Sequence, residues 1–137
     1  MNDSITILSA EESLERISSE SLGRIVVRRK DEMDIFPINF VVADGSIYFR
    51  TAEGNKLFSL ALNNDVLFEV DKVLDGEAWS VVVKGTAEMV RENAEVQYCD
   101  TLPLKPWVST LKRNYVRIVP SKVSGRHFVF GEEPERY

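Results

Sequence analysis

The class of fold is decided by the stretch Ala43-Asp44-Gly45-Ser46-Ile47-Tyr48-Phe49-Arg50-Thr51. Its Asp-Gly pair lies between two runs rich in β-branched and aromatic residues, which is the strongest short-range signal for a two-residue hairpin turn. Ile47 to Thr51 is therefore predicted to be the returning strand of an antiparallel pair.

Short β-rich runs separated by turn residues continue on both sides of this hairpin. Further strands are predicted at residues 22–28, 34–42, 66–73, 78–91, 114–119 and 122–130. The polar turn Asp75-Gly76-Glu77 joins two of these strands into a long hairpin. Pro37 lies inside one run, and because proline cannot donate to a strand ladder, it is expected at a sheet edge or a bulge.

Three segments favour short helices around these strands. Ser9 and Glu12 form a capping-box pattern for a helix over residues 10–19. Residues 55–62 have apolar positions at helical spacing, and residues 92–100 contain no glycine or proline. Six or seven short, mostly antiparallel strands with two or three peripheral helices favour a barrel, because closure removes exposed sheet edges.

Length and composition limit the class of protein. The 137 residues fit a single domain, 1–137, in which residues 1–8 are expected to be flexible or loosely packed. The formal net charge of -5 argues against a nucleic-acid binder, and a single cysteine argues against a disulfide-stapled secreted scaffold. The N-terminus lacks a secretory signal pattern, and the apolar runs are too short to span a bilayer. We therefore expect a soluble cytoplasmic protein with neither a membrane nor a nucleic-acid partner.

The returning strand of the hairpin ends in residues suited to an anion. Arg50 and Thr51 stand at the strand end, Gly54 permits a tight turn, and Lys56 begins a predicted helix. A guanidinium fork, an ammonium and the N–H groups of a helix N-terminus together favour a phosphate dianion. Spacing alone leaves an alternative open, in which Arg50 and Lys56 are two exposed charges on either side of Glu53.

Four blocks of the sequence follow one another in a characteristic order. They are Pro37-Ile38-Asn39-Phe40, the stretch from Asp44 to Leu57, Phe68-Glu69-Val70-Asp71 and the stretch from Gly76 to Gly85. In order and spacing they resemble the pyridoxamine 5'-phosphate oxidase-like, FMN-binding split-barrel family, over roughly residues 10 to 130. The resemblance is closest to the small single-domain members found in actinobacteria. It implies a mostly β fold with peripheral helices, namely a six- to seven-stranded antiparallel split β-barrel.

The resemblance also implies a cofactor and an assembly. Members of the family bind FMN and are homodimers with the cofactor between the subunits. Their strand-end arginine and threonine and the following lysine hold the cofactor phosphate, which assigns this role to Arg50, Thr51 and Lys56. The Pro-Ile-Asn block runs along the isoalloxazine ring in this family, and backbone groups and an amide from it would meet the polar edge of the ring.

Two tryptophans and a serine complete the implied site. Trp79 and Ser80 on the long strand, and Trp107 in a proline-punctuated loop, are candidates to cover the ring, although a tryptophan is more often core or dimer interface. The implied cofactor-binding residues are Pro37, Ile38, Asn39, Phe40, Arg50, Thr51, Lys56, Leu57, Trp79, Ser80 and Trp107.

The reaction is less constrained than the cofactor. Vitamin B6 oxidases of the family carry a C-terminal Arg-x-His arrangement, whereas Arg126 is followed directly by His127 here. We expect an oxidoreductase that passes hydride or electrons through the flavin to a small molecule, with no catalytic residue assigned. The alternative is a non-catalytic module that binds flavin, the deazaflavin F420 or heme. The acidic tail of F420 would call on further basic residues, for which the candidates are Arg24, Arg28, Arg29 and Lys30.

The remaining candidates are interpreted as structural. Cys99 is expected to be a small buried hydrophobe, and His127 lacks the partners of a metal site. Glu69 and Asp71 share one face of a strand, which favours a solvated or interface-lining face over a catalytic carboxylate pair.

Overall fold

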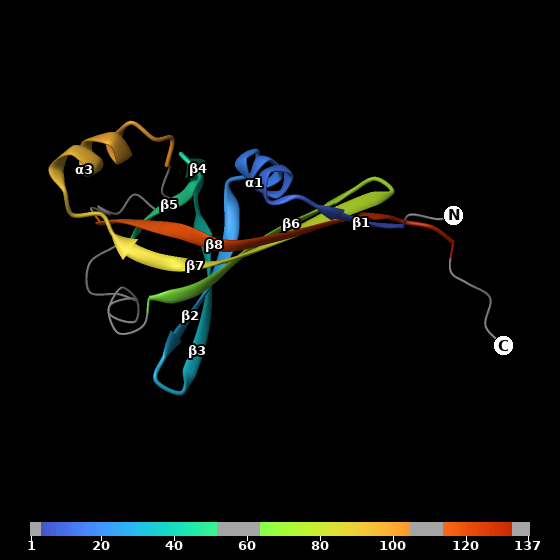
Figure 1. Ribbon diagram of the computed structural model, residues 1–137, viewed down its shortest axis with the longest axis horizontal. Coiled ribbons are helices and arrows are strands. Elements are labelled where there is room, and N and C mark those ends of the chain that lie inside the picture. The colour runs from blue at the N-terminus through green and yellow to red at the C-terminus, as the bar shows by residue number, and fades with distance from the viewer. Residues whose placement is uncertain (1–3, 52–63, 105–113, 133–137) are drawn as a thin grey trace.

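The computed structural model describes residues 4–51, 64–104 and 114–132, which form one curled antiparallel sheet with two helices (Figure 1). The elements are β1 (Ile5–Leu8), α1 (Ala10–Ser18), β2 (Leu22–Arg29), β3 (Glu32–Asn39), β4 (Val41–Ala43), β5 (Ser46–Thr51), β6 (Asp65–Leu74), β7 (Glu77–Met89), α3 (Asn93–Asp100) and β8 (Asn114–Val129). Seven strands follow one another in the order β3-β2-β6-β7-β8-β5-β4, and β1 adds an eighth by pairing with β8. The predicted mostly β, antiparallel split-barrel fold is confirmed.

The two ends of this strand order are joined by one residue of the chain. β3 and β4 are the end strands, and Phe40 connects them. The N–H of Phe40 donates to the carbonyl of Ser21 at 3.0 Å, and its buried ring meets the ring of Phe68 edge-on at 4.9 Å between centroids. β3 also contacts β5. The sheet therefore curls until its two edges lie close together, and we call this meeting of β3, β4 and β5 the seam.

The concave inside of the curled sheet holds the main core. Alternate residues of the long strands point inward, as the two-residue period of a strand requires. Its fully buried members include Ile17, Ile47, Phe68, Val81, Val83, Val116 and Ile118. Trp79 also belongs to this core.

Helix α1 packs against the C-terminal half of β8. The predicted capping box is present, because the Ser9 hydroxyl accepts from the Glu12 N–H at 3.0 Å and the Glu12 carboxylate accepts from the Ser9 N–H at 3.1 Å. Gly125 of β8 leaves room for the helix, since a Cβ there would lie 2.1 Å from the Ser13 hydroxyl oxygen.

Helix α3 covers the outer face of the sheet at β5 and β8. A second apolar cluster lies beneath it and consists of Tyr48, Val90, Cys99, Leu104 and Tyr115. Arg117 of β8 binds Glu95 of the helix and Glu88 of β7, the latter at 2.7 Å. The helix predicted over residues 92–100 is thus confirmed and is held to the sheet by charge as well as by burial.

Strand boundaries depart from the sequence predictions in two places. Ile5–Leu8, expected to be loosely packed, forms β1, because β8 continues past α1 and offers an edge for pairing. The two strands predicted around Pro120 and Ser121 are the single strand β8. A bulge opposite Lys84 and Gly85 accommodates the proline, and the Ser121 hydroxyl donates to the Lys84 carbonyl at 3.0 Å.

The predicted run 34–42 is interrupted at Phe40 and so forms both β3 and β4. Pro37 lies on β3, an end strand of the order, and its register with β2 is continuous. The edge interpretation of Pro37 therefore holds, and the bulge interpretation is wrong. The Asp-Gly hairpin is confirmed, with positive φ at Asp44 (51°) and Gly45 (74°). The helix predicted over 55–62 lies outside the described residues, and no described helix has the length and apolarity to cross a membrane.

Candidate functional site

The predicted phosphate ligands Arg50 and Thr51 are the last two residues of β5. In the register with β8, Arg50 lies opposite Tyr115 and Thr51 lies opposite Asn114. Both side chains are half-buried. The other predicted ligands Lys56, Leu57 and Trp107 lie outside the described residues. The structure thus places two of the three residues predicted to hold the phosphate at the end of β5, and the third lies outside the described residues.

The guanidinium of Arg50 is held over an aromatic ring. Its central carbon lies 5.3 Å from the centroid of the Tyr115 ring, within the range of a cation–π contact. The Tyr115 hydroxyl donates to the Asp100 carboxylate at 2.6 Å. Burial, reinforced by this hydrogen bond, raises the pKa of Tyr115 to about 12, so the phenol remains a neutral donor at physiological pH. The sequence analysis missed Tyr115 and Asp100, and only the register of β5 with β8 would have revealed the first of them.

Arg50 and Thr51 leave β5 on opposite faces, because they are consecutive residues of a strand. Arg50 shares the α3 side with Tyr115, whereas Thr51 shares the inward side with the buried Phe49. An anion that contacts both side chains must therefore lie beyond the end of β5, and not on either face.

β3, the strand predicted to run along the flavin ring, lies at the seam with β5. β3 contacts β5 although the two are far apart in the strand order, because the sheet curls. On β3 the Pro37 side chain is exposed, while Ile38 and Asn39 are half-buried. Phe40 is 2% exposed and packs in the core, so only its backbone is available to a ligand. β3, along which the flavin ring is predicted to lie, therefore contacts β5, the strand that ends in the predicted phosphate ligands Arg50 and Thr51.

Trp79 and Ser80 do not act together, since they point to opposite faces of β7. Trp79 is 4% exposed and packs inside the main core. We therefore withdraw its indole as a cover for a ring at the subunit surface, and the core alternative explains its burial. Ser80 is half-exposed on the outer face, between Asp71 of β6 and Arg126 of β8.

The carboxylate pair on β6 is bound by an arginine of the neighbouring strand. The Arg24 guanidinium lies 2.6 Å from the Glu69 carboxylate and 3.7 Å from that of Asp71. Burial, with a further contribution from Asp71, raises the pKa of Glu69 despite Arg24. The pair lines an outer sheet face, as predicted, and the sequence analysis missed its arginine.

His127 is engaged on both ring nitrogens. Its Nδ1 accepts from the Arg16 guanidinium at 3.0 Å, and its Nε2 lies 3.3 Å from the Glu77 carboxylate. The residue joins α1 to the sheet, which agrees with the structural role that we predicted for it.

Cys99 is 1% exposed in the cluster beneath α3, and burial raises the pKa of its thiol. This is the buried hydrophobe that the sequence analysis predicted. Among residues 4–51, 64–104 and 114–132, no group of His, Cys, Asp and Glu side chains is arranged to hold a metal ion.

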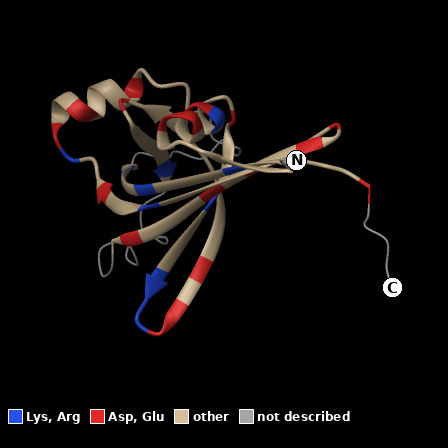
Figure 2. Ribbon diagram, turned by 45° about the vertical axis from the view of Figure 1, so that its right-hand side comes forward, with Lys and Arg blue, Asp and Glu red and all other residues tan. Residues whose placement is uncertain are grey.

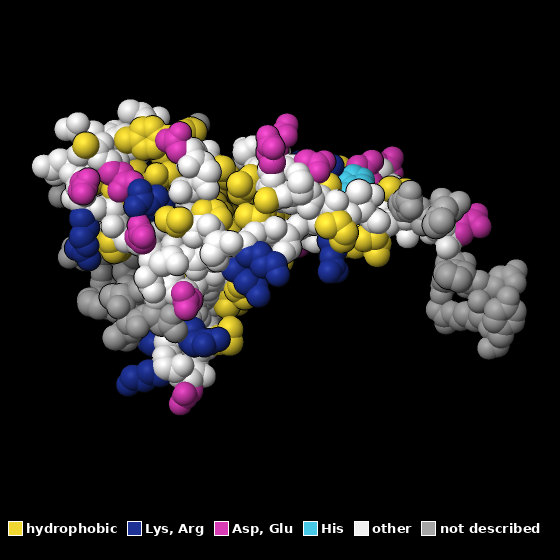
Figure 3. Space-filling model, viewed as in Figure 1, with side chains coloured by type: hydrophobic (Ala, Val, Ile, Leu, Met, Phe, Trp, Pro, Cys, Tyr) yellow, Lys and Arg dark blue, Asp and Glu magenta, His cyan; other side chains and the backbone are white. Residues whose placement is uncertain are grey.

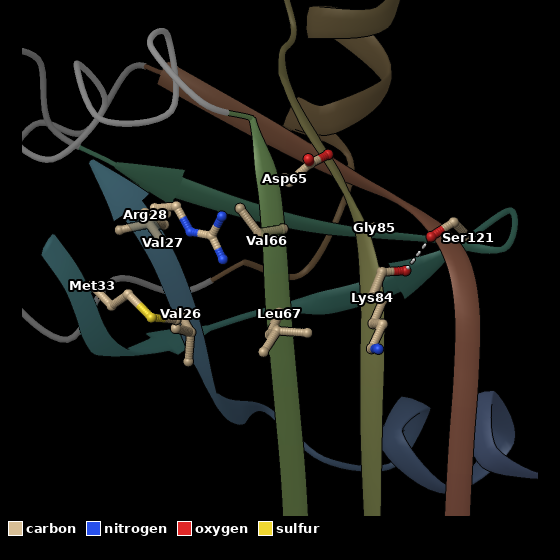
Figure 4. Close-up of a pocket in the computed structure, with 10 residues that line it drawn as sticks. All are labelled: Val26, Val27, Arg28, Met33, Asp65, Val66, Leu67, Lys84, Gly85 and Ser121. Atoms are coloured by element: carbon tan, nitrogen blue, oxygen red, sulfur yellow. Dashed lines mark hydrogen bonds between the residues drawn. The ribbon is translucent and has the colours of Figure 1, made fainter. Parts of the chain in front are cut away.

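A shallow groove of about 400 Å³ crosses the sheet where β2, β6 and β7 run side by side (Figure 4). Leu67 lies between Val26 and Lys84, with Met33 at the β3 side, and Arg28 extends from β2 toward β6. Arg28 is a candidate contact for the tail of F420, and none of these residues belongs to the implied FMN site. The groove is part of a larger uncovered area of the outer face.

Comparison with protein families gives one strong match. Residues 9–127 match the model of the family described as pyridoxamine 5'-phosphate oxidase. A solved structure from Corynebacterium glutamicum, provisionally named a pyridoxamine 5'-phosphate oxidase, is 65% identical, with a TM-score of 0.90 over 97% of this chain and 99% of that one.

Two mycobacterial proteins are also similar. A protein of Mycobacterium smegmatis described as FAD-binding is 44% identical, with a TM-score of 0.80 over 91% of this chain and 99% of that one. An uncharacterised protein of Mycobacterium tuberculosis is 45% identical over 96 residues, which cover 70% of this chain and 87% of the relative.

Proposed function

The chain belongs to the pyridoxamine 5'-phosphate oxidase family, and from this premise we propose that it binds a flavin nucleotide with its phosphate at Arg50. The observation that carries the proposal is the position of Arg50 over Tyr115 at the end of β5, a strand that contacts β3. Thr51 and Lys56 contribute a hydroxyl and a second positive charge to the same anion.

The flavin ring lies along β3 in this proposal. Pro37 to Phe40 supply backbone groups, and Asn39 supplies a side-chain amide. β3 is an end strand, so β2 is its one ladder partner within the described sheet. Leu57 and Trp107 remain proposed contacts from the sequence, and Ser80 is a candidate contact from the outer face.

The nucleotide is FMN by the resemblance of the sequence, and FAD is the second candidate. FAD is favoured by the M. smegmatis protein described as FAD-binding, which is 44% identical to this chain. Both nucleotides carry the same ring, ribityl chain and first phosphate, so Arg50 can bind the first phosphate of either one. Mass analysis of the cofactor released on denaturation distinguishes them.

We propose further that the chain is a flavin-dependent oxidoreductase acting on a small molecule. A bound flavin supplies hydride and single-electron chemistry, and the protein supplies binding, orientation and positive charge. The candidate acid–base groups among the described residues are engaged elsewhere, since Glu69 binds Arg24 and His127 lies between Arg16 and Glu77. No catalytic residue is therefore assigned.

The proposed assembly is a homodimer with the cofactor between the subunits. Most of the exposed large hydrophobic side chains of the described residues gather in two areas, and a folded domain rarely leaves such areas bare. One is the outer face of β2, β3 and β7, with Leu22, Met33, Ile35 and Val82. The other is the arm formed by β1 and the tips of β6 and β8, with Ile5, Ile7, Val73 and Val129 (Figure 3). We propose the first area as the dimer interface, because it contains β3, along which the ring lies.

Heme and F420 are disfavoured by the side chains that they would use. His127 is the one histidine of the chain, and both of its nitrogens are engaged. Arg24 and Arg29, two of the four basic residues that an acidic F420 tail would call on, are paired with Glu69 and Glu32. The basic residues of β2 lie beside the acidic residues of β3 in this hairpin (Figure 2), which also disfavours a nucleic-acid partner.

The proposal is tested on the purified protein. A flavin absorbance spectrum is expected, together with release of FMN or FAD on denaturation. The double variant Arg50→Ala with Lys56→Ala is expected to lose the flavin while retaining the fold and the dimer. Arg29→Ala is the matched control, because it removes an exposed arginine paired with Glu32 at the hairpin tip. Stoichiometric flavin in the double variant would refute the phosphate assignment, and a heme spectrum would refute the cofactor class.

A further inference from the structure

Arg50 and Tyr115 lie opposite each other on the neighbouring strands β5 and β8, and the ring of Tyr115 contacts the guanidinium of Arg50. The two residues are register partners, and the guanidinium carbon lies 5.3 Å from the ring centroid. A cation–π contact is an attraction between the positive charge and the face of the ring and uses no hydrogen-bond donor, whereas a phosphate is bound through the N–H groups of the guanidinium. The ring can therefore orient Arg50 without competing for the same donors.

The Tyr115 ring is itself fixed at two points. It is 5% exposed within the cluster beneath α3. Its hydroxyl donates to Asp100, the last residue of α3, at 2.6 Å. A chain of contacts thus runs from the end of α3 through the ring to the guanidinium.

Helix α3 is in turn anchored to the sheet at other points. The Tyr98 ring lies edge-on to the ring of Tyr48 on β5, at 6.2 Å between centroids, and Arg117 of β8 binds Glu95. These contacts, together with the hydrogen bond from Tyr115 to Asp100, hold the helix to both β5 and β8. The end of the helix that binds the Tyr115 ring is therefore fixed.

We propose that Tyr115 and Asp100 are positioning residues for Arg50, and that they orient its guanidinium toward the phosphate of the cofactor. The inference rests on the proposed function. It adds that helix α3, which supplies no predicted ligand, contributes to phosphate selectivity by holding the Tyr115 ring. An arginine that is oriented before binding loses less side-chain freedom when the phosphate arrives, so part of its contribution depends on this support.

The test compares FMN with riboflavin, which differ only in the phosphate. Both are titrated into the cofactor-free full chain, and the ratio of the riboflavin Kd to the FMN Kd measures phosphate selectivity. Tyr115→Leu is expected to lower this ratio about fivefold while leaving the riboflavin Kd unchanged. Tyr115→Phe and Asp100→Ala, which keep the ring but lose its anchor, are expected to lower it about twofold. Asp100→Asn retains an acceptor oxygen and is expected to restore the ratio.

Tyr48 provides the matched control. It is a buried tyrosine of the same cluster and lies opposite Arg117, not Arg50. Tyr48→Phe and Tyr48→Leu are expected to leave the ratio unchanged, even where they weaken both flavins equally. If Tyr115→Leu is too unstable to titrate, Tyr115→Phe and the two Asp100 variants carry the test.

Combination with Arg50→Ala separates positioning from a general structural role. In the Arg50→Ala background, Tyr115→Leu is expected to cause no further loss of selectivity, since there is no guanidinium to orient. An unchanged ratio in Tyr115→Leu, or a further loss in the Arg50→Ala background, overturns the inference. If the wild-type protein itself does not prefer FMN to riboflavin, the proposed phosphate site fails and this inference fails with it. If selectivity is lost in Arg50→Ala but kept in Tyr115→Leu, only the positioning role is refuted.

Discussion

The outer face of the sheet has one covered part and one bare part. Over β5 and β8 it lies beneath α3, where Tyr48 and Tyr115 are 4% and 5% exposed. Over β2, β3 and β6 it carries a cross-strand row of Ile35, Val26 and Leu67, in which Ile35 is 61% exposed. Both parts carry apolar side chains, but among the described residues a helix covers only the first. In the proposed function the covered part fixes the arginine that binds the phosphate, and the bare part is the interface with a second copy.

The largest expected effect is the loss of the dimer when a charge is placed on the bare part. Ile35→Glu is expected to raise the dimer dissociation constant about 100-fold, because burying an unpaired carboxylate costs about 3 kcal/mol. The stability of the monomer should change by no more than about 0.5 kcal/mol, since the side chain is exposed there. Sedimentation velocity over a range of concentrations measures the dimer dissociation constant, and urea unfolding measures the stability of the monomer.

Val73→Glu on the arm is the matched control for this prediction, because Val73 is 74% exposed at the tip of the β6–β7 hairpin. It is expected to weaken the dimer far less than Ile35→Glu does. The flavin content should fall with the dimer in Ile35→Glu if the cofactor lies between the subunits. A dimer that tolerates Ile35→Glu but is lost in Val73→Glu would move the interface to the arm.

The covered part should open when its central arginine is removed. Arg117 joins Glu88 of β7 to Glu95 of α3 and lies opposite Tyr48 in the register of β5 with β8. Arg117→Ala is expected to lower the free energy of unfolding by about 2 kcal/mol, because carboxylates that are partly buried lose their partner. Arg117→Met should cost less, since it keeps the volume of the side chain.

Cys99 reports this opening directly, because it is the single cysteine of the chain and lies beneath α3. Its reaction with a thiol reagent under native conditions should be about 30-fold faster in Arg117→Ala than in the wild type. Arg29→Ala, which removes an exposed ion pair with Glu32, should leave the rate unchanged. Equal rates in all three proteins would show that Arg117 does not hold the helix.

The contrast between the two parts also marks what the sequence could predict. The Asp44-Gly45 hairpin, the capping box of α1 and the helix of residues 93–100 depend on local signals, and all three are confirmed. The placement of Arg50 and Thr51 at a strand end was likewise predictable from the run that contains them.

Contacts between distant strands were beyond the sequence. Tyr115 beneath Arg50 and Arg24 beside Glu69 depend on strand register, which no local pattern specifies. A strand in which buried and exposed residues alternate does not reveal which face a helix will cover, so Trp79 was considered both as core and as a cover for the ring. The bulge that lets Pro120 stay within β8 depends on the partner strand and is equally non-local.

The smallest expected effect lies in the charge cluster of the bare part. Burial raises the pKa of Glu69, so the folded protein keeps this proton at a pH where the unfolded chain has lost it. The free energy of unfolding should therefore fall as the pH rises from the ordinary carboxyl value through the raised one. Glu69→Gln does not titrate and should remove this contribution, with a relative change of about 1–2 °C in Tm across the window. Arg24 opposes the effect, which keeps it small.

Glu32→Gln is the control, because it also breaks an arginine ion pair but at an exposed site. If the free energy of unfolding instead rises with pH in this window, Arg24 lowers the pKa of Glu69 by more than burial and Asp71 raise it. The same measurement connects the cluster to the proposed interface, since a second copy seated on the bare part would bury Glu69 further. The pH dependence removed by Glu69→Gln should then be steeper in the dimer than in the Ile35→Glu monomer. An equal slope in both would place Glu69 outside the interface and confine the contact to the neighbouring apolar row.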